Sequence, residues 1–94
     1  MGHNVYITKA DRPSESKQRP ILKSDWLRAV KADRELELEE GSPNHAIWVD
    51  ENGDERGRLL FHLGHVVAKN PSEEFIYKIR QMAGELSANV IDDL

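Results

Sequence analysis

The chain has 94 residues, no cysteine and a formal net charge of −4. This length suits one domain with a modest core, and the lack of cysteine excludes disulfides, thiolate metal sites and a cysteine nucleophile. No apolar run approaches the ~20 residues of a transmembrane helix, and the N-terminus lacks the pattern of a signal peptide. We therefore expect one domain over residues 1–94, located in the cytoplasm and not in a membrane.

The charges are unevenly distributed along the chain. Residues 1–34 carry eight Lys or Arg and four Asp or Glu, whereas residues 35–94 carry five and thirteen, so the two parts have net charges of +4 and −8. Such an uneven charge distribution is typical of proteins that bind a partner through a polar surface. It is also expected when two oppositely charged halves face each other in the fold.

The first third predicts a strand, a loop and a helix. Residues 4–9 are rich in β-formers and predict a strand. Residues 10–20 contain two prolines, two serines and mixed charges, which predicts a flexible loop. Ser24 is expected to cap a helix that begins at Asp25. The apolar face of this helix contains Trp26, Leu27 and Val30.

The middle of the chain predicts a series of short strands. Residues 35–40 alternate Glu and Leu, which favours a half-buried strand, and residues 41–44 form a turn cluster. Asn52-Gly53 is a strong hairpin signal, and Gly64 permits another reversal. The further strands are expected at residues 46–49, 59–63 and 66–69.

The closing segment predicts an amphipathic helix and a last strand. Asn70 is expected to cap the helix, Pro71 suits its first position, and Glu73 completes a spacing like that of a capping box. Residues 88–91 predict a short final strand. The apolar stripe of the helix consists of Phe75, Ile76, Ile79, Met82, Ala83 and Leu86.

Together these elements predict a small two-layer α+β domain. Hairpin-linked strands favour a mostly antiparallel sheet of three to five strands, with two helices on one face. The predicted core contains Val5, Ile7, Trp26, Leu27, Val30, Ile47, Trp48, Leu60, Val66, Phe75, Ile79, Met82 and Leu86.

Motifs spread over most of the chain resemble those of an uncharacterised family of small bacterial proteins. They are the start Val5-Tyr6-Ile7-Thr8-Lys9-Ala10, the helix with Pro20-Ile21 and Trp26-Leu27, the strand Ala46-Ile47-Trp48, the turn Val66-Val67-Ala68-Lys69-Asn70-Pro71 and the tail Asp92-Asp93. Some relatives of that family look like immunity proteins that are encoded beside toxins. The resemblance implies a partner-neutralising role and supplies no catalytic residues.

Protein binding is the function that the sequence favours. An acidic surface would steer the chain toward a basic partner such as a toxin or a nuclease. The candidate contacts are Glu35, Glu37, Glu39, Glu40, Asp50, Glu51, Asp54 and Glu55. A homodimer formed by strand edges is a simpler alternative.

A nucleic-acid-associated accessory role is the second hypothesis. The basic residues of 9–34 would form its patch, with Trp26 as a base-stacking ring or, alternatively, as a core residue. The candidate contacts are Arg12, Lys17, Arg19, Lys23, Arg28 and Lys31.

A small enzyme of unknown reaction is the third hypothesis, and we name no catalytic residue for it. The serines have local explanations as caps or loop residues, and no glycine-rich phosphate loop is present. His62 and His65 flank Gly64, and strand alternation would place them on opposite faces unless the turn intervenes. Whether His45 joins them is left open. Because zinc would need further carboxylate ligands here, we expect no metal and no cofactor.

Overall fold

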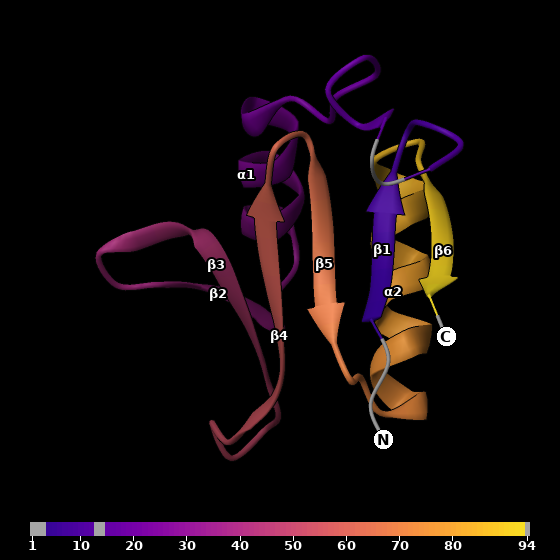
Figure 1. Cartoon of the computed structure of the whole chain (residues 1–94). Helices are drawn as coiled ribbons and strands as arrows, with labels where there is room; N and C mark the ends of the chain where they lie inside the picture. The colour runs from indigo at the N-terminus through magenta and orange to yellow at the C-terminus, as the bar shows by residue number, and fades with distance from the viewer. Residues whose placement is uncertain (1–3, 13–14, 94) are drawn as a thin grey trace.

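In the computed structural model, which describes residues 4–12 and 15–93, the elements follow in the order β1-α1-β2-β3-β4-β5-α2-β6 (Figure 1). The helices are α1 (Lys23–Ala32) and α2 (Glu73–Glu85). The strands are β1 (Asn4–Thr8), β2 (Leu36–Glu39), β3 (Ser42–Val49), β4 (Glu55–His62), β5 (His65–Lys69) and β6 (Asn89–Asp93). No helix in these described ranges is long and apolar enough to cross a membrane.

The strands form one antiparallel sheet in the order β2-β3-β4-β5-β1-β6. The α+β class is confirmed, but the prediction of three to five strands is wrong because the sheet has six. The first strand lies between β5 and β6, so Tyr6 pairs with Val67 on one side and with Ile91 on the other. Segments from the two ends of the sequence are thereby brought side by side.

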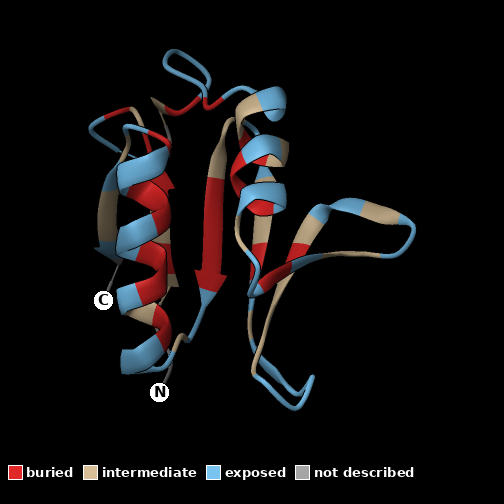
Figure 2. Ribbon diagram, turned by 180° about the vertical axis from the view of Figure 1, so that it is seen from behind, coloured by how far each residue is buried: buried red, intermediate tan, exposed pale blue. Residues whose placement is uncertain are grey.

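Both helices lie behind the sheet in Figure 1 and in front of it in Figure 2, which is seen from the opposite side. We call the face that neither helix covers the open face. The helices bury their apolar stripes against the sheet, where the buried residues of Figure 2 gather. The core includes Val5, Ile7, Ile21, Trp26, Val30, Ala46, Leu59, Val66, Phe75, Ile79, Met82 and Leu86.

Two core predictions are wrong, and both concern the side of a strand that a residue occupies. Ile47 and Leu60 are only partly buried, whereas their chain neighbours Ala46 and Leu59 are 0% and 1% exposed and point into the core. Alternate residues of a strand face opposite sides, so a shift of one residue exchanges the buried set. Leu27 and Trp48 are also partly buried and pack against the core.

The helix starts differ from the predicted ones. Helix α1 begins at Lys23 and its N-cap residue is Leu22, without a side-chain cap, because buried Ile21 fixes the entry by donating its N–H to Gly64 O at 2.9 Å. Helix α2 is capped by Ser72, whose Oγ accepts the N–H of Phe75 at 3.2 Å. Asn70 instead takes a left-handed conformation with φ +50°, which asparagine tolerates in turns.

The predicted turn cluster at residues 41–44 is mostly strand. Gly41 has φ +76° and makes the reversal, and Ser42, Pro43 and Asn44 already belong to β3. Leu38 pairs with Ala46 whereas Glu39 pairs with Ser42, so the extra residues 43–45 form a bulge within this segment of β3. Proline is tolerated there because a bulge leaves a backbone N–H without a ladder partner.

The described part of loop 10–20 is attached to the sheet. Ser16 is 1% exposed, and its Oγ lies 2.8 Å from Thr8 Oγ1. Thr8 Oγ1 also accepts the N–H of buried Ala10 at 3.1 Å. The loop therefore has a buried anchor beside the end of β1. Its flexibility stays a prediction.

Candidate functional site

The predicted acidic contacts lie along one edge of the sheet. Strand β2 is the outermost strand on that side, and it forms a hairpin with β3 that extends away from the body of the molecule (Figure 1). The β3–β4 turn lies at the other end of β3. We call the carboxylates of these two segments the acidic edge. They are Glu35, Glu37, Glu39, Glu40, Asp50, Glu51, Asp54 and Glu55.

Glu35 is engaged by a cation from helix α2. Lys78 Nζ lies 2.9 Å from Glu35 Oε1 and 2.5 Å from Asp33 Oδ2, and the lysine side chain is only 8% exposed. Burial lowers the pKa of Lys78, but its hydrogen bonds to the two carboxylates and their charges raise it further, so the net shift is upward. Glu35 is therefore part of a structural ion-pair cluster.

Glu39 and Glu55 are engaged by a second cation, Arg58. Arg58 Nε lies 3.0 Å from both carboxylate oxygens of Glu55, and Arg58 Nη1 lies 3.2 Å from Glu39 Oε1. Glu39 also lies 3.8 Å from His45 Nδ1, which is 2.6 Å from Ser42 Oγ. These carboxylates are half-exposed and largely neutralised by neighbours.

Asp50 is used by the β3–β4 turn. Its Oδ1 accepts the N–H groups of Asn52 and Asp54, both at 2.9 Å, while Gly53 takes φ +84° at the tip. This geometry is the side-chain turn that aspartate commonly makes. The carboxylate is thereby assigned a local structural role.

Four carboxylates of the acidic edge remain available. Each is exposed, and its side chain makes no ion pair or hydrogen bond within the described ranges 4–12 and 15–93. They are Glu37, Glu40, Glu51 and Asp54. The structure thus divides the eight predicted contacts into structural and available carboxylates, a distinction that sequence spacing could not make.

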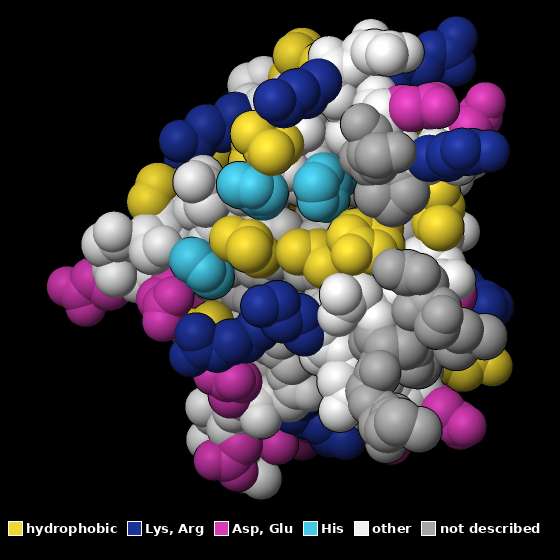
Figure 3. Space-filling view, viewed as in Figure 1, with side chains coloured by type: hydrophobic (Ala, Val, Ile, Leu, Met, Phe, Trp, Pro, Cys, Tyr) yellow, Lys and Arg dark blue, Asp and Glu magenta, His cyan; other side chains and the backbone are white. Residues whose placement is uncertain are grey.

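The open face carries a row of side chains that crosses five strands. Register places His45 beside Leu60, Leu60 beside Val67, Val67 beside Tyr6 and Tyr6 beside Ile91. Figure 3 shows hydrophobic side chains across the middle of this face, with histidines and cations around them. Sequence reasoning missed this row because its members come from segments far apart in the chain.

His62 and His65 meet on the open face. They pair across the β4–β5 hairpin, and their ring centroids are 6.0 Å apart. The two turn residues between them, Leu63 and Gly64, have φ +49° and +83°, so the turn intervenes and brings both imidazoles to one side. His45 instead lies in the row of Leu60. No group of three or more metal-ligating side chains occurs in the described part of the chain.

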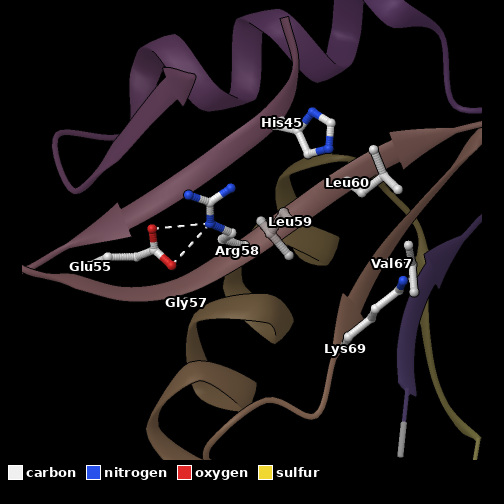
Figure 4. A pocket seen from close by; sticks show the side chains of 8 residues that line it. All are labelled: His45, Glu55, Gly57, Arg58, Leu59, Leu60, Val67 and Lys69. Atoms are coloured by element: carbon white, nitrogen blue, oxygen red, sulfur yellow. Dashed lines mark hydrogen bonds and ion pairs between the residues drawn. The ribbon is translucent and has the colours of Figure 1, made fainter. Parts of the chain in front are cut away.

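A shallow hollow of about 420 Å³ opens where β4 diverges from β5. Arg58 and Lys69 reach it from the two sides, and the Lys69 side chain extends along β5 toward Val67 (Figure 4). Its volume falls within the range of small-ligand pockets. The hollow is lined by His45, Glu55, Gly57, Arg58, Leu59, Leu60, Val67 and Lys69.

The predicted nucleic-acid contacts are all exposed but occupy two regions. Arg12, Lys17 and Arg19 belong to the loop that follows β1, and this loop meets the β4–β5 turn where Ile21 N–H contacts Gly64 O. Helix α1, on the other side of the sheet from the open face, carries the remaining three (Figure 1). They are Lys23, Arg28 and Lys31, of which Arg28 lies 3.8 Å from Asp25.

Trp26, the predicted alternative stacking ring, is a core residue. It is 0% exposed, stacks on Phe61 with ring centroids 5.7 Å apart, and donates its Nε1–H to Pro43 O at 3.0 Å. No base can reach this ring.

No family model, curated protein or solved structure matches the chain. Function must therefore be inferred from the chain's own surfaces.

Proposed function

We propose that this chain is a non-enzymatic protein-binding module that captures a basic partner through its acidic edge. The observation that carries the proposal is a set of four exposed, unengaged carboxylates within the described ranges, two of them on or next to the outer strand β2 and two on the β3–β4 turn. An outer strand presents backbone N–H and C=O groups that an extended segment of another chain can pair with. Carboxylates beside such a strand favour an approaching segment that is rich in Lys or Arg.

A nuclease or another toxin that binds nucleic acid is the partner class that fits this chemistry. Such an enzyme needs a basic surface for its phosphate contacts, and an acidic protein that covers the surface would inhibit it. A bacterial immunity or inhibitor role is the specific form of the proposal. It agrees with the resemblance described above.

The acidic edge can be tested without disturbing its structural carboxylates. We would reverse Glu37, Glu40 and Glu51 to Lys together and leave Glu35, Glu39, Asp50 and Glu55 unchanged. Affinity capture from a lysate of the source organism would use low and moderate salt, nuclease treatment and mass spectrometry. The loss of three rim ion pairs, worth about 0.5 kcal/mol each, should lower affinity roughly ten-fold.

The matched control reverses three exposed carboxylates elsewhere, with Asp11→Lys, Glu73→Lys and Glu85→Lys. One stoichiometric protein that the wild type and the control capture, and that the triple variant loses, would support the proposal. Equal capture by all three would show that the acidic edge is not the contact. Thermal unfolding of each variant would confirm that the fold is retained.

A further inference from the structure

We propose that the open face of the sheet binds single-stranded nucleic acid. This second surface adjoins the acidic edge at Arg58, which pairs with Glu39 and Glu55. Its rings, apolar row and basic loop are not part of that edge, so the inference does not rest on the protein-binding proposal. It rests on three observations about the open face: a contiguous group of rings, two cations on one side of an apolar row, and a basic loop attached at the opposite end.

The open face carries aromatic and imidazole rings, and stacking of bases on such rings is one of the two ways in which proteins bind single strands. Tyr6 and His65 have ring centroids 5.6 Å apart, and His65 and His62 have centroids 6.0 Å apart. The three rings therefore form a continuous group over β1, β5 and β4. Neighbouring rings of this group meet edge to face, at 60° and 84°, so an unpaired base can stack on the face of one ring at a time, whereas a base inside a duplex cannot.

Cationic groups flank the apolar row on the side away from the histidines. Arg58 and Lys69 stand two residues beyond Leu60 and Val67 on their strands, which places them about 7 Å along the strand from the row. Arg58 shares its charge with Glu55 and Glu39. Lys69 is exposed and lines the hollow between the two strands. Phosphates could therefore follow this side of the row.

The basic loop extends the cationic surface at the opposite end. Backbone contact between Ile21 and Gly64 holds the loop against the turn that joins His62 to His65. In Figure 3, Lys and Arg side chains lie next to the paired histidines at this end. Exposed Arg12, Lys17 and Arg19 belong to the loop. The structure thus connects half of the predicted nucleic-acid contacts to the open face.

The net charge of −4 does not oppose this inference, because the carboxylates next to the apolar row, Glu39 and Glu55, are paired with Arg58. Eight of the seventeen carboxylates belong to the acidic edge, and several of those are paired with cations. A binding face depends on its local field, which salt screens beyond about 8–10 Å. A sheet face can also hold the unstacked bases of a single strand, whereas the bases of a duplex stay stacked inside it.

The test is fluorescence anisotropy with a labelled mixed-sequence single-stranded RNA and the matching DNA. We expect binding at low salt that weakens between about 50 and 200 mM salt, with a log–log slope of roughly −0.7 for each phosphate contact. Tyr6→Leu keeps apolar packing and removes the ring, so affinity should fall at least five-fold. Lys69→Gln should make the slope shallower by about 0.7.

Tyr77→Leu is the matched control, because Tyr77 is 73% exposed on α2, on the other side of the sheet. Its affinity should equal that of the wild type, and thermal unfolding would confirm that Tyr6→Leu is folded. Absence of binding at low salt would overturn the proposal. Equal losses of affinity in the two tyrosine variants, or tighter binding of a duplex than of the single strand, would also overturn it. An affinity for poly-glutamate equal to that for the nucleic acid would overturn it too, because it would identify a general polyanion or acidic-protein surface.

Discussion

His62 and His65 face each other across the β4–β5 hairpin, with ring planes at 84°. Burial lowers the pKa of His65, the charge of His62 lowers it further, and a backbone hydrogen bond with Leu63 opposes both. The unfolded chain therefore takes up this proton more readily than the folded chain. The stability contributed by neutral His65 is complete above about pH 6.5 and is lost as the pH falls toward the folded-state pKa.

We predict that His62→Gln raises the pKa of His65, because it removes the like charge. The difference in melting temperature between pH 7 and pH 5 should become smaller. NMR titration of the His65 ring protons and thermal unfolding at the two pH values would measure both effects. His45→Gln is the control and should leave His65 unchanged. An unaltered His65 titration in His62→Gln would show that the two rings are not coupled.

Gly57 is required by the packing of α2 on β4. A Cβ added at Gly57 would lie 2.5 Å from Phe75 Cδ2 and Cε2, whereas one at Gly84 would meet nothing within 4 Å. Gly57→Ala should therefore destabilise the fold by about 1–3 kcal/mol through overpacking. Gly84→Ala should stabilise it by about 0.4–1 kcal/mol by restricting the unfolded chain. Urea unfolding would compare the two, and equal effects would be evidence against a close contact at Gly57.

The two tryptophans are expected to respond differently to replacement by phenylalanine. Trp26 Nε1 donates to Pro43 O, while Trp48 Nε1 is buried and has no hydrogen-bond partner within residues 4–12 and 15–93. Trp26→Phe should cost about 2–4 kcal/mol, because it loses the hydrogen bond and leaves a cavity. Trp48→Phe should cost less, because it removes an unpaired donor and leaves a ring to stack on Phe75. Chemical denaturation would measure both, and the reverse order would refute this assignment.

Lys78 connects α2 to the segment between α1 and β2. Lys78→Met should destabilise the fold by about 1–3 kcal/mol, because it leaves the carboxylates of Asp33 and Glu35 without their cation. Since the folded-state pKa is raised, the contribution is complete below about pH 10.4 and is lost as the pH rises through that pKa. The wild type should lose stability in this alkaline range more steeply than the variant. Lys69→Met, at an exposed position, should change stability by less than about 0.5 kcal/mol.

Local chemistry predicted most of the elements. The β-branched run at Val66, the hairpin signal at Asn52-Gly53 and the apolar stripe from Phe75 to Leu86 all correspond to structure at those places. These signals act over a few residues, so neighbouring residues are enough to specify them. Helix caps were less predictable, because Asn70 and Ser72 are both good cap residues and the path of the turn decided between them.

The binding surfaces could be predicted only in part. The sequence showed that carboxylates are abundant between Glu35 and Glu55, but only the fold brings Lys78 to Glu35 and Arg58 to Glu39. The open-face row was not predictable, because residues such as Tyr6 and Ile91 are adjacent only after the sheet has formed. The face of β4 that each residue occupies was also not predictable: Leu60 joins this row, whereas Leu59 enters the core.

By itself the sequence determined most of the strands and helices along the chain, the apolar stripe of α2 and the division of charge between the two parts of the chain. These properties depend on side-chain type and spacing along the backbone. The tertiary structure alone decided the strand order, the face on which each strand residue lies and the carboxylates that remain available. The physical reason is that these properties depend on pairing between distant segments, whose energies are set by the whole sheet and its two helices.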